Sequence, residues 1–232
     1  MSMKWLQSLV LSLVLALFGA ASATSAPSGE ICSAFRDGKV DPEIIAQMLQ
    51  AAAQGHLYRV KQDASRVEFC VDHALAGQIH GEFRSFEGGV SLSPESSEGN
   101  RALLLVRADS IRTGNAAIEA LAKNDLFFDA ERFPEILFVS RRFEIVEPGR
   151  ARLYGDLTLH GVTRPVAFDV QVDVEAQRRE SAAGDRIALA ARTTVRRSEF
   201  GMTHLKRLVS DEVTLCLKFV VERIHPQRVA SG

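Results

Sequence analysis

The sequence lacks the short motifs that most enzymes and metal sites require. It has only three cysteines and no CxxC pair, which argues against a zinc ribbon or a thioredoxin-like redox centre. Its six histidines form no HxH or HExxH pair, and neither a glycine-rich phosphate loop nor a GxSxG elbow occurs. We therefore expect no catalytic residues, no metal site and no cofactor.

An excess of charge of either sign is also missing. Lys and Arg number 28 against 29 Asp and Glu, which is a formal net charge of −1. A nucleic-acid-binding surface needs a concentrated basic patch, whereas the basic pairs of this chain are scattered among acids. Beyond the N-terminus no apolar run approaches the roughly 20 residues of a membrane-spanning helix. We expect neither nucleic acid nor a stably inserted segment among the interactions of the folded domain.

The N-terminus has the features of an export signal. Lys4 precedes an apolar run over roughly residues 9–21, which is too short to span a bilayer, and small residues follow it. Small residues at alternate positions predict cleavage after Ala23 or Ala26. We expect residues 1–26 to be a signal peptide and the protein to be periplasmic or secreted.

Residues 27–56 are expected to form an N-terminal helical pre-domain. Asp41 is suited to cap a helix, Pro42 to its first position and Gly55 to its end, which predicts a helix over 41–55. Apolar residues recur within it at helical spacing, so one side must be covered. Two placements are open: the helix packs on the outside of the main domain, or it covers a ligand entrance.

From residue 57 the apolar pattern changes to a period of two, which is typical of strands with one buried and one exposed face. In "VEFCVD", for example, Val67, Phe69 and Val71 share one face. We expect eight long strands, near 65–73, 78–90, 101–109, 135–146, 150–160, 164–175, 185–197 and 211–223. Most connections are short, so neighbouring strands should pair antiparallel. Eight such strands close into a barrel whose interior is filled by side chains or holds one ligand.

One connection, residues 109–134, is long for a compact domain, and such excursions are usually functional. Asn115 can cap a short helix within it. The expected fold is therefore an all-β, eight-stranded antiparallel barrel over residues 57–224. A helical excursion joins strands 3 and 4, an extra helix precedes the barrel, and residues 225–232 form a C-terminal tail.

The stretch "GDLTLHGVTRPV", residues 155–166, gathers polar residues but does not read as a catalytic cluster. Asp156, Thr158 and His160 alternate along one strand, so Asp156 and His160 lie about 13 Å apart and cannot form a hydrogen-bonded pair. Pro165 begins the next strand, where its missing N–H does least harm. We interpret the stretch as structural.

That stretch, together with "DSIRTGN", "DLFFDAERFPEILFVS", "RSEFGM" and "VEFCVDH", resembles the YceI-like family of bacterial periplasmic proteins. The agreement is co-linear from about Tyr58 to Glu222. The resemblance implies an extended lipocalin-like barrel that holds a polyisoprenoid or another long-chain lipid. The chain departs from the family in its long loop, where residues 118–121 replace the usual Arg-Asp pair and histidine, and in its N-terminal helix.

The apolar faces and this resemblance predict an exported protein without enzymatic activity, which sequesters a long-chain, polyisoprenoid or fatty-acid-like lipid inside the barrel. The expected wall residues are Phe69, Val71, Leu104, Val106, Phe138, Leu157, Phe168, Val170, Val195, Leu215, Leu217 and Phe219. The residues expected at the opening are Phe127, Phe128 and Phe200, with His73, Arg112 and Arg197 beside a head group. Two alternatives stay open: a stress-related or interaction module with a filled barrel, and an enzyme acting on a hydrophobic metabolite. A homodimer is also open.

The cysteines allow one disulfide prediction. Cys70 lies on the outward face of the first expected strand and Cys216 on that of the last. These strands are neighbours in a closed barrel, so the two thiols could meet if their Cα atoms lie within about 4.4–6.8 Å. We expect a Cys70–Cys216 bridge; a bridge from Cys32 to either residue, or none, are the alternatives.

Overall fold

The computed structural model describes residues 40–92, 99–172 and 185–225. The expected signal peptide, its cleavage sites, Cys32 and most of the C-terminal tail lie outside these residues. The helices are α1 (Pro42–Ala53) and α2 (Ala116–Lys123), with short 3₁₀ turns η1 (Gln62–Ala64), η2 (Ala108–Ser110) and η3 (Arg197–Phe200). The strands are β1 (Leu57–Val60), β2 (Arg66–His73), β3 (Gly77–Phe83), β4 (Phe86–Ser91), β5 (Arg101–Arg107), β6 (Ile111–Arg112), β7 (Glu135–Glu147), β8 (Arg150–Leu159), β9 (Val162–Val172), β10 (Arg186–Arg196) and β11 (Val209–Arg223).

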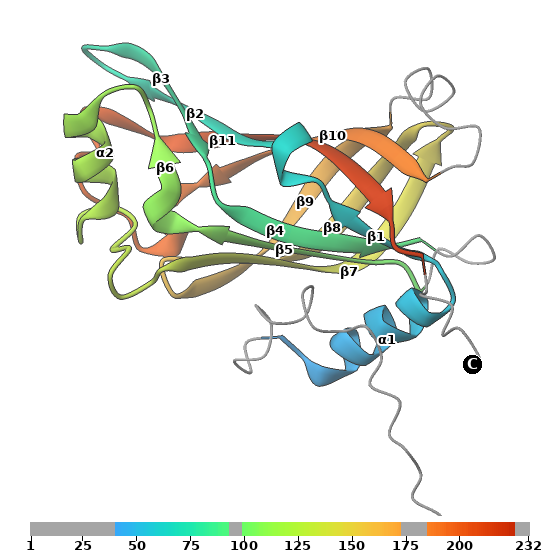
Figure 1. Cartoon of the computed structure of the whole chain (residues 1–232). Coiled ribbons are helices and arrows are strands. Elements are labelled where there is room, and N and C mark those ends of the chain that lie inside the picture. Colours follow the sequence, from blue (N-terminus) through green and yellow to red (C-terminus); the bar gives the residue numbers. More distant parts are fainter. Residues whose placement is uncertain (1–39, 93–98, 173–184, 226–232) are drawn as a thin grey trace, which may run out of the picture.

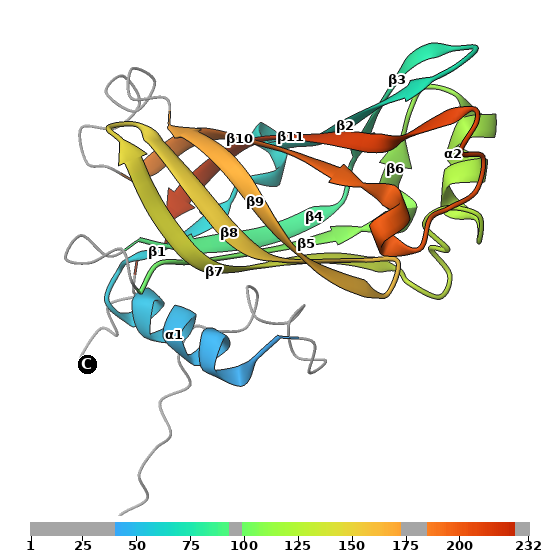
Figure 2. The same ribbon diagram turned by 180° about the vertical axis from the view of Figure 1, so that it is seen from behind.

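The strands form one antiparallel sheet that closes on itself (Figures 1 and 2). The order β1-β4-β5-β7-β8-β9-β10-β11 is closed by pairing between β1 and β11, and β2, β3 and β6 continue from the first half of β11. This confirms the expected eight-stranded antiparallel barrel. Three of its walls are each divided into two elements, because η1, η2 and the residues between β3 and β4 interrupt them at neighbouring positions.

The alternation of apolar and polar residues decides which side chains enter the barrel. On β9, Phe168 and Val170 are buried while Asp169 between them is exposed. β7 changes its inward set part way along, because its register with β8 shifts between Ser140 and Arg142. Such a bulge adds one residue and reverses which positions face the core.

Helix α1 packs on the outside of the barrel, which confirms the first of the two placements (Figure 1). Asp41 caps it by accepting the N–H of Glu43 at 2.9 Å. Met48 is buried against a cluster that includes Leu103 and Leu105. The run "LLLV" of β5 has no alternation because both faces are covered, the outer one by α1 and the inner one by the barrel core.

The polar stretch of residues 155–166 holds the β8–β9 hairpin against η3, which confirms its structural role. The Nδ1 of His160 donates to the Phe200 carbonyl at 3.0 Å, and the Nε of Arg164 donates to the Glu199 carbonyl at 3.1 Å. The hydroxyls of Thr158 and Thr163 pair across the two strands at 2.8 Å. The stretch therefore anchors the residues that border one end of the barrel.

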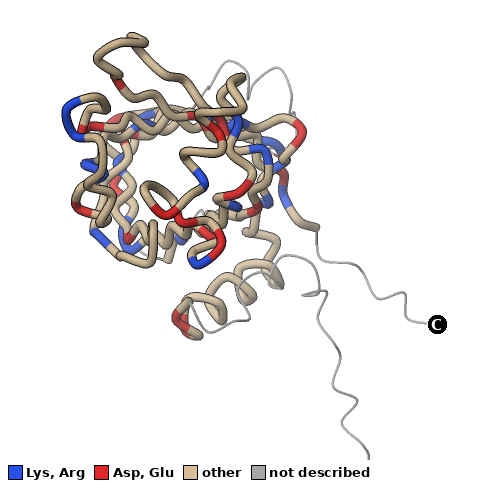
Figure 3. The backbone as a smooth tube through the Cα atoms, turned by 90° about the vertical axis from the view of Figure 1, so that its left-hand side faces the viewer, with Lys and Arg blue, Asp and Glu red and all other residues tan. Residues whose placement is uncertain are grey.

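The long connection between β6 and β7 is ordered around α2, as expected. The Oδ1 of Asn115 accepts the N–H groups of Ala117 and Ile118 at 3.0 and 3.2 Å. After the helix the chain turns back, and Phe128 packs edge-on against Phe83 with ring centroids 5.6 Å apart. The excursion thereby covers part of one barrel end (Figure 3).

Candidate functional site

The barrel encloses one long apolar cavity with a volume of about 760 Å³. Its lining extends from Phe127 and Leu205 at the end that carries α2 to Ile145 and Ile187 at the opposite end. Aliphatic and aromatic side chains dominate the lining. A volume of this size is typical of pockets that hold a small-molecule ligand.

All of the predicted wall residues line this cavity. The residues that the sequence placed there and that do line it are Phe69, Val71, His73, Leu104, Val106, Phe127, Phe128, Phe138, Leu157, Phe168, Val170, Val195, Arg197, Leu215, Leu217 and Phe219. The period-two pattern succeeded because each strand keeps one face toward the axis over most of its length.

Two predicted site residues do not line the cavity. Phe200 is completely buried beneath the end of the barrel, within the hydrophobic core. Arg112 is exposed and lines a separate cleft on the outer surface, where its Nη1 donates to the Ile111 carbonyl at 2.7 Å. Neither side chain therefore contributes to the cavity wall. The sequence could not predict the direction of either side chain, because both residues lie in short connecting elements, η3 and β6, that are too short to show a periodic pattern.

Several lining residues were missed. They include Val67, Ile136, Leu153, Leu189, Ala191 and Val213. Each lies two, four or, for Leu189, six positions from a predicted wall residue on the same strand, so strict continuation of the alternation would have found them. Ile118 and Leu121 of α2 also line the cavity. Only the docking of this helix onto the barrel end reveals that.

Aromatic rings pack against glycines along the wall. Gly155 faces the ring of Phe138, because a Cβ built at Gly155 would lie 2.6 Å from Phe138 Cζ. Gly81 faces Phe69 in the same way, at 2.3 Å. Phe138 in turn packs edge-on against Phe168, with centroids 5.2 Å apart. These contacts set the shape of the apolar interior.

At the α2 end, two polar residues of the lining, Arg197 and His73, hold the backbone in place. Arg197 is 3% exposed and donates to the carbonyls of Met202, Val209 and Ser210 at 2.7, 3.0 and 2.9 Å. Burial lowers the pKa of its guanidinium. The Nδ1 of His73 accepts two N–H groups of the turn after β2, at 3.0 and 3.2 Å. Both residues thus fix the loops that frame this opening.

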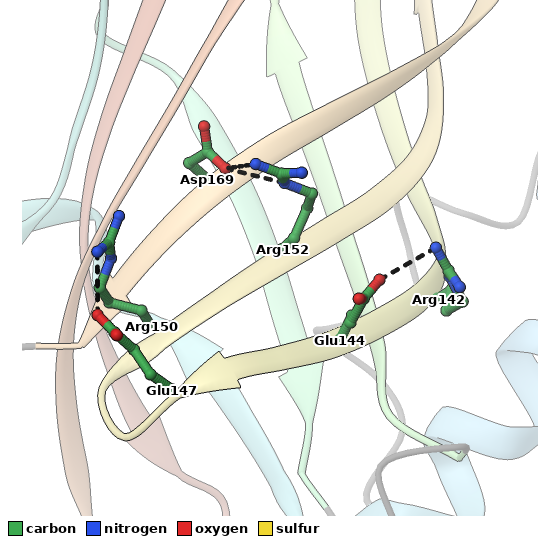
Figure 4. A network of polar contacts seen from close by, with 6 residues as sticks. All are labelled: Arg142, Glu144, Glu147, Arg150, Arg152 and Asp169. Carbon is green, nitrogen blue, oxygen red and sulfur yellow. Dashed lines mark hydrogen bonds and ion pairs between the residues drawn. The ribbon is translucent and has the colours of Figure 1, made fainter.

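The opposite end carries charged residues that neutralise one another on the outer surface (Figure 4). Glu147 and Arg150 form an ion pair at 2.9 Å across the β7–β8 turn. Arg142 pairs with Glu144 at 3.1 Å, and Arg152 with Asp169 at 2.9 Å. Glu147 and Arg150 also touch the cavity at its limit.

The two described cysteines do not form the expected disulfide. β2 and β11 are neighbours as predicted, but Cys70 lies opposite Thr214 and Cys216 lies opposite Glu68. The cysteines are therefore diagonal, and such positions are about 7–8 Å apart, which exceeds the span of a disulfide. Both thiols are free. The prediction was wrong because the face of a residue follows from the sequence, whereas the register of two distant strands does not.

Within the described ranges, no group of three or more His, Cys, Asp and Glu side chains is placed to hold a metal ion. In the same part of the chain, no helix has the length and apolar character needed to cross a membrane.

Comparison with known proteins agrees with this architecture. The sequence model of the YceI-like domain matches residues 58–221. A UPF0312 protein of Pseudomonas putida (strain W619) is 27% identical over 147 residues, which are 62% of this chain and 76% of that relative. The crystal structure of Burkholderia cenocepacia BcnA has a TM-score of 0.61 at 21% identity, covering 69% of this chain and 98% of BcnA. A polyisoprenoid binding domain from Saccharophagus degradans, implicated in plant cell wall breakdown, has a TM-score of 0.55 at 15% identity, covering 72% and 98%.

Proposed function

Because the chain belongs to the YceI-like domain family, we propose that it is a binding protein that sequesters a long-chain lipid inside its barrel. The lipid is of the polyisoprenoid or fatty-acid-like type, with a hydrocarbon chain in the cavity and a polar end near an opening. The name of the Saccharophagus degradans domain, a structural neighbour, supports this choice of ligand class.

The observation that carries the proposal is the length of the cavity and the apolar character of its lining. Apolar side chains from both ends of the barrel line one continuous space of about 760 Å³. A hydrocarbon chain gains free energy in such a space because its surface leaves water. About ten buried methylenes at about 0.8 kcal/mol each amount to roughly 8 kcal/mol, which corresponds to micromolar affinity before association costs.

The cavity favours binding over the two alternatives. A module with a filled barrel requires side chains to occupy the axis, whereas here the axis is open over much of its length. An enzyme would require titratable groups that converge inside the barrel. The lining residues His73 and Arg197 are instead engaged in holding backbone, so the proposal includes no catalytic step.

We infer that the protein acts after export, in the periplasm or outside the cell. The N-terminal sequence supports this, since a basic residue, an apolar run and small residues follow one another in residues 1–26. Determining the N-terminus of the protein accumulated by its host tests the inference. A start at residue 24 or 27 is expected, and a chain that begins at Met1 contradicts it.

Filling the cavity tests the binding proposal without introducing a buried charge. Ala191 on β10 is buried and lines the cavity, whereas the neighbouring Ala190 is exposed on the outer face. Ala191→Phe should weaken binding about tenfold or more, which is a loss of about 1.4 kcal/mol, because its ring occupies the path of the chain. Ala190→Phe is the matched control and should bind as the unchanged protein does.

Binding is measured by displacement of a fluorescent long-chain fatty acid by unlabelled fatty acids and polyisoprenols, after delipidation. If the folded, delipidated protein takes up neither lipid at micromolar concentration, the proposal fails. If Ala191→Phe and Ala190→Phe bind lipid equally well, the lipid lies outside the cavity. Organic extraction and mass spectrometry of protein purified from its native host would identify the bound molecule.

A further inference from the structure

The end of the barrel that carries α2 presents exposed leucines beside the cavity. Leu75 at the tip of the β2–β3 hairpin is 83% exposed, and Leu205 and Leu208 in the loop after η3 are 40% and 37% exposed. Three exposed leucines in one place are unusual, because isolated exposed apolar residues are common but grouped ones mark contact surfaces.

These leucines belong to one surface, although they lie far apart in the sequence. The N–H of Ala74 donates to the Leu208 carbonyl at 2.8 Å, and His73 lies opposite Val209 in the β2–β11 pairing. Figures 1 and 2 show the hairpin and the loop at the same end of the barrel from opposite sides. We call Leu75, Leu205, Lys206, Arg207 and Leu208 the leucine rim.

The leucine rim is continuous with the cavity. Leu205 is both exposed and part of the cavity lining, and Ala76 of the hairpin lines it as well. The backbone holds Leu205 at φ +54°, a left-handed conformation that bulky residues rarely adopt. Its carbonyl accepts the N–H groups of Leu208 and Val209, both at 2.9 Å, which fixes the conformation. A chain that leaves the cavity at this end therefore passes over apolar side chains.

Two cations complete the rim. Lys206 and Arg207 are exposed, and among the residues that the structure describes neither forms an ion pair. Two acids of the same end form no ion pair with these cations: Asp72 accepts from Gln78 at 3.1 Å, and Asp211 accepts from the Ser198 hydroxyl at 2.7 Å. Lys206 is near enough to Asp211 for its charge to help lower the pKa of that carboxyl. Exposed leucines that flank exposed cations match the surface of an anionic bilayer, which offers phosphate groups above hydrocarbon.

Among the described residues, the opposite end of the barrel lacks this combination. Ile145 and Val146 are 66% and 62% exposed there, so that end is apolar too. Its neighbouring charges form ion pairs with one another, including Arg142 with Glu144 and Glu147 with Arg150 (Figure 4). Paired charges give no net attraction to an anionic surface, so the described residues of the two ends differ in ion pairing rather than in apolar exposure.

We propose that the leucine rim docks onto anionic lipid bilayers, so that a lipid chain passes between bilayer and cavity without crossing water. This proposal rests on the proposed function, because it supplies the route by which the cargo enters. Only the side chains of the leucine rim enter the lipid–water interface of the bilayer, and the barrel itself stays in water.

Flotation or co-sedimentation with vesicles of phosphatidylglycerol and phosphatidylethanolamine tests the docking, with cargo-free protein. Leu75→Asp should lower vesicle binding about tenfold or more, because it removes a leucine and adds a repelled charge. The double variant Lys206→Gln/Arg207→Gln should lower it about 25-fold, at about fivefold for each cation near an anionic surface. Vesicles of phosphatidylcholine alone should bind the unchanged protein weakly.

Val146→Asp is the matched control, since it makes the same kind of change on an exposed residue at the opposite end. It should leave vesicle binding unchanged. Neither Leu75 nor Val146 lines the cavity, so both variants should bind a fluorescent fatty acid in solution as the unchanged protein does. All proteins are purified from the native host and share one N-terminus. Any contribution of the N-terminus to vesicle binding is therefore the same in the unchanged protein and its variants.

The outcomes separate this proposal from the proposed function. The docking proposal alone is overturned if the protein takes up the soluble fatty acid normally and if neither Leu75→Asp nor Lys206→Gln/Arg207→Gln lowers vesicle binding. Equal losses for Val146→Asp and Leu75→Asp also overturn it. Should sedimentation reveal a dimer that Leu75→Asp dissociates while vesicles remain unbound, the rim contacts a second copy and the proposal is wrong.

Discussion

At the scale of single residues, the shape of the cavity depends on positions where a side chain is missing. Gly155 on β8 has no special backbone conformation, but a Cβ there would meet Val139 O at 2.4 Å and Phe138 Cζ at 2.6 Å. The glycine therefore lets the ring of Phe138 lie flat across the neighbouring strand. Removing a wall glycine changes the packing of an aromatic residue rather than the backbone.

We predict that Gly155→Ala destabilises the protein by about 1–3 kcal/mol, because the added methyl displaces a buried ring and approaches a backbone oxygen. Urea unfolding followed by circular dichroism measures the free energy of unfolding. Gly99→Ala is the control, since nothing lies within 4 Å of a Cβ at that position. It should change stability by less than about 0.5 kcal/mol. Equal effects of the two substitutions would contradict the prediction.

The sequence could not assign this role to Gly155. A glycine within a strand pattern indicates a bulge, a bend or a close approach, but not which residue approaches. The same limit applies to Arg197 of "RSEFGM". The sequence predicts it beside a ligand head group but does not show whether it binds a ligand or the protein's own backbone. Its partners are carbonyls of the loop after η3 and of β11, and only the fold brings these around one guanidinium.

At the scale of elements, α1 acts as an external support of the wall. Met48 is 4% exposed and packs with Leu57, Leu103 and Leu137 on the side away from the cavity. We predict that Met48→Ala costs about 2–5 kcal/mol of stability, since it leaves a gap between helix and sheet. Lipid affinity below the unfolding temperature should stay unchanged, because Met48 packs on the outer face of the sheet and does not line the cavity.

Thermal unfolding and lipid displacement, measured on the same preparation, check this separation. Gln50→Ala is the control on the exposed face of α1 and should be nearly neutral. A Met48→Ala protein that unfolds as the unchanged protein does would show that α1 is not a support. A protein that is stable but no longer binds lipid would revive the alternative in which α1 covers a ligand entrance.

Acid should loosen the junction between η3 and β11. The Ser198 hydroxyl and N–H both donate to Asp211, and these hydrogen bonds lower the pKa of its carboxyl from the ordinary value of 3.8. Because the pKa is lower in the folded than in the unfolded chain, the contribution is complete above 3.8. It is lost as the pH falls through the folded-state pKa.

The measurement is the difference in unfolding free energy between the unchanged protein and Asp211→Asn. We predict that the unchanged protein is the more stable at neutral pH and that the difference shrinks once the pH is below about 4. A difference that stays constant down to pH 2 would show that the charge of Asp211 contributes nothing. Since the carboxyl is near the surface, high salt should reduce its effect.

At the scale of the whole molecule, the closure of the barrel places Cys70 and Cys216 on adjacent strands, but two positions out of register. We predict that both thiols are free in the folded protein, even in an oxidising compartment. Alkylation in denaturant without reductant, followed by peptide mass spectrometry, should label both. Recovery of a peptide pair joined through these two cysteines would contradict the register of β2 and β11.

The sequence by itself determined the class of fold and most of the cavity wall. Alternating apolar residues assign an inward face on each strand, and the short connections leave antiparallel pairing as the simple solution. The wall residues on β9 and β11 follow directly from this, because the barrel interior is the place where their apolar face leaves water. Capping residues likewise placed α1 and α2, since a cap acts within one turn of its own helix.

Only the tertiary structure decided what depends on contacts between distant segments. The register of β2 and β11 separates Cys70 from Cys216, the docking of α1 covers β5, and the fold of η3 buries Phe200 and binds Arg197. The leucine rim exists only because one hairpin and one loop meet at the same end of the barrel. A periodic pattern orients a side chain relative to its own strand, whereas a site needs strands positioned relative to one another, and that positioning comes from the packing of the whole chain.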